Sequence, residues 1–371
     1  MVIRSDEMDT SFVKEIEALG GESVRKCYQC ASCTATCPLT TEVKAFPRRT
    51  IRLVQLGLRE RAMQSPDMWL CSACVTCKAS CPRQADPGEI MAALRRYAYS
   101  KYSWLPRFTR HLTASPKFTV PLMAIVGGIL LALLYSASGI SKGLASVDFA
   151  AFLPTIFVDA AGIALGLTVA FGIGMNSFNL WRTVGRGSDD PPQWTVSQRL
   201  KNLVDVIVGE VAFQRTLRKC NTGRLQWIGH LSLILGFAGA GITTSLVFIL
   251  NAGGKPFALD HPIKILGNAS AALLLFGGGV LIARRIFAKS AVDKTHFQDG
   301  LFLSLLFIVA LTGTLSEVAR LFSEAVVAYS SYSIHLVSTA LLLGLAPYTK
   351  FAHAIYRPLA MYLAKLRGWP D

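Results

Sequence analysis

The chain has 371 residues, a formal net charge of +15 and a hydrophobic content of 52%, yet only 16% of its residues are charged. Ordinary globular proteins contain about 25% charged residues, and a basic nucleic-acid-binding protein would carry more total charge than this chain does. The apolar fraction also excludes a disordered chain. The composition therefore favours a membrane protein that contacts lipid and no nucleic acid, and whose positive excess reflects its orientation in the bilayer.

Eight of the nine cysteines lie in two identical runs with the spacing Cys-x2-Cys-x2-Cys-x3-Cys-Pro. In bacterial ferredoxins with this spacing, three close cysteines bind one [4Fe–4S] cluster and the fourth binds the other cluster. A zinc site needs only one or two Cys-x-x-Cys pairs, and residues 1–20 contain no export signal that would favour disulfides. The expected ligands are Cys27, Cys30, Cys33 and Cys81 for the first cluster, and Cys71, Cys74, Cys77 and Cys37 for the second.

The segments beside the cysteine runs are predicted to be helical. Apolar residues share one face of a helix over residues 42–64, and a second helical stretch covers residues 89–99. This pattern favours an α-helical ferredoxin domain over residues 1–110. Within it, Ala45-Phe46-Pro47-Arg48, Gln55-Leu56-Gly57 and Trp69-Leu70-Cys71-Ser72-Ala73-Cys74 resemble the C subunit of heterodisulfide reductase. The resemblance implies a domain that relays electrons from or to a flavin or iron–sulfur partner.

Six apolar runs in residues 111–371 are long enough to span a membrane, which takes about 20 residues. The fourth run is the weakest because it begins with Lys264 and Asn268, so five spans are the main alternative. Its three consecutive glycines, Gly277, Gly278 and Gly279, indicate close packing between helices. The expected spans are 119–138, 155–178, 227–250, 263–283, 300–321 and 333–354.

Basic residues are concentrated ahead of the first span, in the 182–226 and 284–294 connections, and after the sixth span. The other three connections contain only two basic residues, Lys142 and Lys255. Because positively charged loops stay on the cytoplasmic side, we expect a multi-pass protein of the cytoplasmic (inner) membrane. Both termini and the cysteine domain are then cytoplasmic.

The 182–226 connection is predicted to contain an amphipathic helix, because Leu200, Leu203, Val204 and Ile207 recur at helical spacing. Two interpretations remain open: a helix lying in the membrane interface, or a cytoplasmic helix packed on the cysteine domain. Cys220, the ninth cysteine, is interpreted as a small buried or interfacial residue.

Five of the six histidines lie beyond residue 220, and their positions suggest haem ligands. His335 and His353 are 18 residues apart, so one continuous helix would place them on the same face near opposite edges of the membrane. We predict that His230 pairs with His353 at an inner haem b, and that His261 pairs with His335 at an outer haem b. His296 is the alternative at the inner site. The sequence lacks the Cys-x-x-Cys-His motif of covalently attached haem.

The segment from Ala346 to His353, followed by Arg357-Pro358, is similar to the last helix of nitrate reductase gamma-type cytochromes b. It departs from that family at Ala240, where the family has a second histidine on the third span. The fusion of both parts resembles the QmoC family, the membrane subunits of quinone-interacting membrane-bound oxidoreductases. This resemblance implies menaquinone as substrate, heterodisulfide reductase A-like flavin and iron–sulfur partners, and electron exchange with adenylylsulfate reductase in sulfur metabolism.

The expected fold is thus all-α, with an α-helical ferredoxin domain followed by a six-helix transmembrane cytochrome b bundle. Glu317, Lys264 and Arg320 form a candidate quinone site near the outer haem, with a salt bridge or a haem-propionate clamp as the alternative. Three other functions remain open. They are a heterodisulfide reductase component that uses another lipid-soluble carrier, a passive membrane anchor, and a transporter, against which the absence of internal repeats argues.

Overall fold

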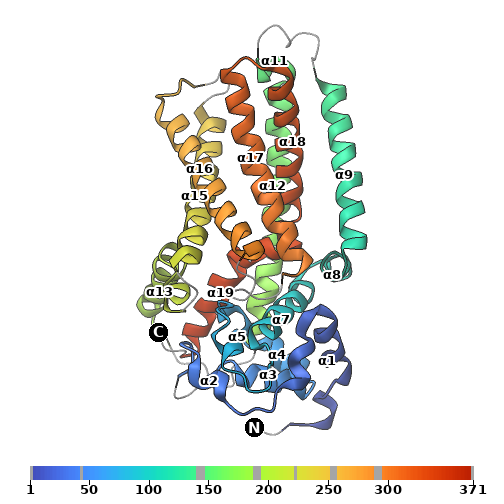
Figure 1. Ribbon diagram of the computed structural model, residues 1–371, viewed down its shortest axis with the longest axis vertical. Coiled ribbons are helices and arrows are strands. Elements are labelled where there is room, and N and C mark those ends of the chain that lie inside the picture. Colours follow the sequence, from blue (N-terminus) through green and yellow to red (C-terminus); the bar gives the residue numbers. More distant parts are fainter. Residues whose placement is uncertain are drawn as a thin grey trace.

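The computed structural model describes residues 3–41, 45–138, 147–186, 194–220, 224–250, 257–287 and 295–368. All secondary-structure elements longer than one residue assigned in these ranges are helices or helical turns, so the predicted all-α class is confirmed. The N-terminal helices form a compact unit at one end of a bundle of long helices, and the C-terminal helix returns to the same end (Figure 1). We call this end the iron–sulfur end and the opposite one the far end. The predicted loop lysines Lys142, Lys255, Lys289 and Lys294 lie outside the described residues.

Six helices of the described chain are long and apolar enough to cross a membrane, as predicted. Their apolar side chains point outward into what would be lipid: Ile125 is 62% exposed and Leu167 is 68% exposed. The bundle helices are α9 (Pro116–Ala137), α12 (Thr155–Gly185), α15 (Arg224–Leu250), α16 (Pro262–Phe287), α17 (Phe297–Leu321) and α18 (Ala325–Gly344).

The predicted sixth span, 333–354, is wrong in its bounds. Helix α18 ends at Gly344, and two short 3-10 turns, η6 (Ala346–Tyr348) and η7 (Lys350–Ala352), separate it from α19 (His353–Leu366). Pro347 explains the break, because proline lacks an amide donor and clashes with the preceding turn of a helix. The carbonyl of Pro347 accepts a hydrogen bond of 2.8 Å from Asn176 Nδ2 of α12. His335 and His353 therefore do not share one continuous helix.

Small residues bring α15 and α16 close together. A Cβ built on Gly277 would lie 2.5 Å from the carbonyl oxygen of Gly229, and one on Gly236 would lie 2.9 Å from that of Ser270. Backbones can approach this closely only where side chains are absent or small. Gly277 and Gly278 thus serve packing, as the sequence indicated, whereas Gly279 does not. Gly277 holds the start of α15 in place.

The N-terminal unit is built from short helices around the cysteine runs. The predicted helix over residues 42–64 is two helices in its described part, because Gly57 adopts a left-handed conformation with φ of 69° between them. The predicted 89–99 helix extends in both directions, with Asp86 capping its start. The helices are α1 (Thr10–Ile16), α2 (Ser32–Thr36), α3 (Arg48–Gln55), α4 (Arg59–Gln64), α5 (Asp67–Leu70), α6 (Thr76–Ala79) and α7 (Pro87–Tyr102), with single turns η1 (Ser5–Glu7), η2 (Glu17–Gly21) and η3 (Glu22–Lys26).

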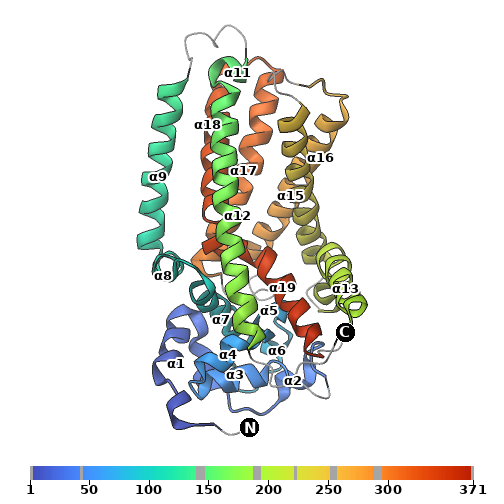
Figure 2. The ribbon, with the colours of Figure 1, turned by 180° about the vertical axis from the view of Figure 1, so that it is seen from behind.

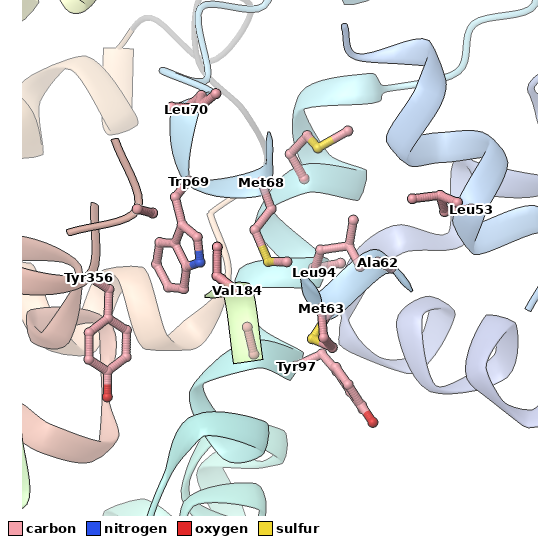
Figure 3. Close-up of a cluster of buried hydrophobic side chains, with 14 of the residues drawn as sticks. Leu53, Ala62, Met63, Met68, Trp69, Leu70, Leu94, Tyr97, Val184 and Tyr356 are labelled. Carbon is pink, nitrogen blue, oxygen red and sulfur yellow. The ribbon is translucent and has the colours of Figure 1, made fainter. Parts of the chain in front are cut away.

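One hydrophobic core joins the N-terminal unit to the bundle. Trp69 of α5 meets Tyr356 of α19 edge to face, with ring centroids 5.5 Å apart. Leu180 and Val184, at the end of α12, are fully buried in the same cluster. Figure 3 shows Trp69, Val184 and Tyr356 converging from three separate parts of the chain. The predicted division at residue 110 therefore separates two parts that share buried side chains.

The amphipathic helix predicted in the 182–226 connection is present, and among the described residues it packs on the C-terminal helix and not on the cysteine domain. It forms α13 (Val196–Asp205), the π-helical turn η4 (Val206–Ala212) and α14 (Arg215–Lys219). One side packs on α19, where Lys365 pairs with Asp205 at 2.6 Å, and Figure 2 shows α13 beside α19. On the other side Leu200 and Ile207 are exposed, which suits an interfacial helix. The remaining helices are α8 (Pro106–Ala114) and α11 (Phe149–Phe152).

Candidate metal centres

The eight clustered cysteines line two separate cavities in the N-terminal unit. Each cavity contains three cysteines of one run and the last cysteine of the other run, the sets that the spacing predicted. The first cavity is lined by Cys27, Cys30, Cys33 and Cys81. The second is lined by Cys37, Cys71, Cys74 and Cys77. Pro87, at the start of α7, lies in the wall of both cavities, so the two sites are neighbours.

The backbone around each run is wound in the same way. The second and fourth residues after the first cysteine have positive φ in both runs: Gln29 and Ala31 in the first, Ala73 and Val75 in the second. Non-glycine residues adopt this conformation at a cost of about 1–3 kcal/mol each, and such strain persists where a site requires it. Alternating right- and left-handed residues turn successive amides toward one centre. The amide of Ala73 already donates to Cys71 Sγ at 3.4 Å.

The cysteine cavities fit a cluster of several metal ions better than a single ion. Among the described residues, no three His, Cys, Asp or Glu side chains converge as ligands of one ion. A tetrahedral zinc ion would draw all four sulfurs to about 2.3 Å from one point. Four thiols that surround a common cavity without converging are the arrangement that a cubane cluster requires.

Electrostatics also favours a metal-bound state. Burial raises the pKa of the Cys37 thiol to about 11, and burial likewise raises the pKa of Cys27 and of Cys33. Burial therefore disfavours the thiolate forms of these three cysteines unless a cation compensates them. Cys30 differs because it is exposed, and a hydrogen bond from Ser32 lowers its pKa. The first cavity thus opens to solvent at Cys30.

Cys220 joins the second cavity from the 182–226 connection. Its side chain is 6% exposed and lines the same wall as Cys71 and Cys74. It shares a hydrogen bond with Cys74. The sequence predicted a small buried residue, which is what Cys220 is. Its place beside a cluster site carried no sequence signal, because it lies far from both runs.

His230 of α15 and His353 of α19 face each other at the iron–sulfur end of the bundle, with ring centroids 6.4 Å apart. Their Nδ1 atoms are engaged, at 3.0 Å from Gln214 Oε1 and at 2.5 Å from the Lys350 carbonyl oxygen. Two imidazoles that bind one metal ion through nitrogens about 2 Å away have ring centroids about 6 Å apart. The pair therefore fits a six-coordinate haem iron, with the Nδ1 contacts holding each ring in orientation.

His335 lies between α17 and α18, away from the other histidines. Its Nδ1 is 2.9 Å from the carbonyl oxygen of Val309, and a Cβ on Gly313 would come within 2.9 Å of its ring. The absence of a side chain at position 313 makes room for the imidazole. Because α18 begins at Ala325, His335 stands near the middle of the bundle and not at its far edge.

The rings of His261 and His335 each have other contacts, so their pairing at an outer haem stays a prediction. His261 precedes α16 at the far end, where its Nδ1 accepts from the Ile263 amide at 3.3 Å and its ring stacks on Phe257. Lys264, in the first turn of α16, pairs with Glu317 of α17. Glu317 is one helical turn further along α17, toward the far end, than Gly313, which packs against His335. The structure does not bring His261 and His335 together. The reason is the earlier start of α18, which moves His335 inward.

His296, the alternative ligand at the inner site, caps α17. Its Nδ1 accepts a hydrogen bond of 3.4 Å from the amide of Gln298, so the neutral ring carries its proton on Nε2. Burial lowers the pKa of His296 to about 4, and the charge of Arg96 lowers it further. His230 is therefore the better partner for His353.

The candidate quinone residues form an ion-pair network near the far end. Lys264 Nζ lies 2.7 Å from Glu317 Oε2, and Arg320 lies 2.8 Å from Glu317 Oε1. All three side chains are about one-fifth exposed or less. Since both oxygens of Glu317 are engaged, the network favours the salt-bridge interpretation and has one excess positive charge.

The helical unit with two four-cysteine cavities defines a ferredoxin-type electron-transfer domain attached to a membrane bundle. Residues 26–86 match a family model described as a 4Fe-4S dicluster domain. The chain is 31% identical over 117 residues to the C subunit of the ferredoxin/F420H2-dependent CoB-CoM heterodisulfide reductase of Methanosarcina acetivorans, covering 71% of that protein and 31% of this chain. The chain therefore belongs to the family of heterodisulfide reductase C subunits through its N-terminal part.

Other relatives cover less of their own length. Identity is 38% over 108 residues with the second iron–sulfur C subunit of the CoB–CoM heterodisulfide reductase of Methanocaldococcus jannaschii, covering 58% of that protein and 27% of this chain. It is 32% over 97 residues with the C subunit of the H2:CoB-CoM heterodisulfide,ferredoxin reductase of Methanothermobacter marburgensis, covering 52% of that protein and 26% of this chain. No solved structure matches the chain.

The family model lies within the N-terminal unit, and these relatives match 26–31% of this chain. The chain spans about half the length of the Methanothermobacter relative. The family consists of subunits of oxidoreductase complexes, and the dicluster domain binds [4Fe–4S] clusters. The protein thus combines iron–sulfur electron transfer with a membrane-spanning helical region.

Proposed function

We propose that the protein transfers electrons between a quinone in the membrane and a soluble flavin or iron–sulfur partner. The proposal includes the finer assignments made from the sequence: two haems b, menaquinone as substrate, heterodisulfide reductase A-like partners and a link to adenylylsulfate reductase. It also places both termini in the cytoplasm and divides the chain into an iron–sulfur domain and a cytochrome b domain. When bound, the clusters and haem each carry one electron at a time.

The observation that supports the proposal most directly is the His230–His353 pair and its position. The pair lies where the bundle meets the N-terminal unit, and its ring spacing of 6.4 Å suits axial ligands of one iron. His353 begins α19, and one turn later Arg357 donates to Ser72 Oγ at 2.9 Å, next to Cys71. One helix thus connects a candidate haem ligand to the wall of the second cysteine cavity.

The residues between these sites hold ligands and exclude water. Gln214 and the Lys350 carbonyl orient the two imidazoles. Trp69, which is 1% exposed, and Tyr356, which is fully buried, fill the space between α5 and α19. A rigid, dry connection keeps the distance between the centres constant and holds their environment at low dielectric, both of which set the reduction potential.

A second haem depends on His335, which has no histidine partner at its level among the described residues. His335 remains a predicted ligand because its Nδ1 is oriented by Val309 and Gly313 leaves room for its ring. His261, as its partner, rests on the sequence argument alone. The quinone assignment of Glu317, Lys264 and Arg320 likewise rests on their depth in the membrane and on their excess positive charge, which suits a quinone oxygen or a haem propionate.

Haem and iron quantitation on the purified full-length protein tests the proposal. We expect a reduced-minus-oxidised spectrum of b-type haem, two [4Fe–4S] clusters per chain, and reduction of the haem by a menaquinol analogue. A His353→Ala variant should lose low-spin haem at the inner site, because its remaining ligand His230 cannot hold six-coordinate iron alone. A His111→Ala variant is the matched control and should retain all haem.

The outcomes separate this function from its rivals. A protein with clusters but no haem would refute electron transfer through the bundle and favour a passive anchor. Haem loss in the His335→Ala variant, with inner haem intact, would establish the second site. A different lipid-soluble carrier that co-purifies with the protein would favour the alternative heterodisulfide reductase component.

A further inference from the structure

Arg357 connects the membrane half to the second cysteine cavity. Its guanidinium donates to Ser72 Oγ at 2.9 Å and to the Leu70 carbonyl oxygen at 3.4 Å. Ser72 follows the cluster ligand Cys71 and itself lines the second cavity. The residue lies on α19, one helical turn beyond His353. A positive charge from the membrane half is thus held at the wall of the second site.

No carboxylate of the described chain forms an ion pair with Arg357. Arg96, also at this junction, differs because Glu89 lies 2.7 Å from it. Burial lowers the pKa of Arg357 and the nearby cation of Arg95 lowers it further, while Cys71 and Glu210 act in the opposite direction. A partly buried guanidinium without a paired anion is costly, which indicates that its counter-ion is a group at the cavity.

Resting on the proposed function, we propose that Arg357 is the counter-ion of the second [4Fe–4S] cluster, held by Cys37, Cys71, Cys74 and Cys77, and that this cluster is the neighbour of the His230–His353 haem. Four thiolates give such a cluster a net negative charge that grows when it is reduced. A nearby cation stabilises the reduced form more than the oxidised form, and so raises the reduction potential. In the exchange, the single electron gained by the cluster is the one lost by the haem iron, or the reverse, and no bond changes.

The first cysteine cavity, unlike the second, is exposed to solvent. Tyr28 in its wall is 68% exposed, and Arg83 lies over its ring at 4.2 Å. Beside Cys27 a hollow of about 530 Å³ opens to solvent, with Lys14 and Arg52 among its lining residues. The first cluster site is thus accessible to a soluble protein, whereas the second is covered by Arg357 and Cys220 of the membrane half. This difference in exposure puts the second cluster next to the haem and the first cluster next to the soluble partner.

Redox titration of the full-length protein, followed by electron paramagnetic resonance for the clusters and by absorbance for the haem, tests the inference. In Arg357→Gln we expect one cluster to become harder to reduce, so that its equilibrium with the haem shifts about tenfold, which corresponds to about 59 mV for one electron. The other cluster should keep its midpoint potential. Arg357→Lys keeps the cation and should remain close to the unmodified protein.

Arg83→Gln is the matched control, because it removes an arginine from the wall of the first cavity. Arg83 is exposed, so solvent screens its charge and we expect a much smaller shift, confined to the other cluster. Ser72→Ala removes the hydroxyl that Arg357 contacts but keeps the charge, and should shift the potential less than Arg357→Gln.

Several results would overturn the inference. One is an Arg357→Gln protein with two assembled clusters and unchanged cluster potentials. Another is a shift of the haem potential alone, which would make Arg357 a partner of the haem propionates. If the Arg357→Gln protein does not assemble clusters, the Arg357→Lys protein provides the test. A large decrease of its cluster reduction potential, although the cation is retained, would contradict the counter-ion role. A cluster shift in a protein that binds no haem would preserve the counter-ion and refute only the proposed function.

Discussion

At the scale of single residues, the junction between the N-terminal unit and the bundle depends on buried charges. Arg96 of α7 pairs with Glu89 at 2.7 Å, lies 3.6 Å from Asp299 of α17, and donates to the Leu19 carbonyl. Asp299 is paired in turn with Lys350, whose carbonyl orients His353. A network of this kind is satisfied only when every member is present. The electrostatic neighbours of the inner histidine site therefore include residues of the N-terminal unit.

Glu89→Gln should destabilise the protein by about 3–5 kcal/mol, because it leaves Arg96 buried without its strongest counter-charge. Both side chains of the pair are almost fully buried. Glu60→Gln is the control, since Glu60 pairs with Lys101 at 2.8 Å on an exposed surface and its loss should cost less than about 1 kcal/mol. Thermal unfolding in detergent measures both. Equal losses in the two variants would contradict the role of burial.

At the scale of helices, the contact between α15 and α16 positions the inner histidine site. His230 lies one residue after Gly229, whose carbonyl oxygen packs against Gly277 of α16. A side chain at position 277 would push the two helices apart at the level of His230. The three consecutive glycines of α16 differ in this respect, because a Cβ on Gly279 would meet nothing within 4 Å.

Gly277→Val should therefore destabilise the bundle by about 1–3 kcal/mol through overpacking, and it should weaken binding of the inner haem. Gly279→Val is the matched control, with the same substitution two residues away in open space. Haem content per chain and melting temperature are the measurements. If the two variants behave alike, close packing at Gly277 is not what holds His230.

At the scale of the whole molecule, the even number of spans agrees with the position of the termini. Six candidate spans run between an N-terminal unit and a C-terminal helix that lie at the same end of the bundle (Figure 1). The basic 182–226 connection is at this end too, with Trp194 Nε1 donating to the Leu366 carbonyl at 2.7 Å. Positive charge at this end predicts that it is cytoplasmic.

Reporter fusions test that orientation. A fluorescent protein that folds only in the cytoplasm should be fluorescent when fused after residue 368, and a phosphatase active only outside should be inactive there. A phosphatase fused after Ser138, between the first two spans, should be active. The reverse pattern would refute the assignment of the positive-charge excess to the cytoplasmic side.

Local patterns in the sequence account for much of this architecture. The cysteine spacing predicted which four thiols line each cavity, because short-range spacing determines how a loop wraps a cluster. Apolar run length predicted six spans, because the bilayer thickness sets it. The order of the spans also predicted the His230–His353 pair. His230 lies near the start of the third predicted span and His353 near the end of the sixth, and the predicted topology puts both of these ends on the same side of the membrane.

Three features were decided only by tertiary structure. The depth of His335, near the middle of the bundle, depends on where α18 begins and on how it docks against its neighbours. The ends of apolar runs do not mark where helices stop. The places of Cys220 and Arg357 beside the second cavity join residues far apart in the chain, and no periodicity encodes such contacts. The sequence by itself determined which cysteines line each cavity and the number of candidate spans, because these depend on local spacing and length. Tertiary packing decided which histidines meet and which cysteine cavity lies against the bundle, because these depend on contacts between distant segments.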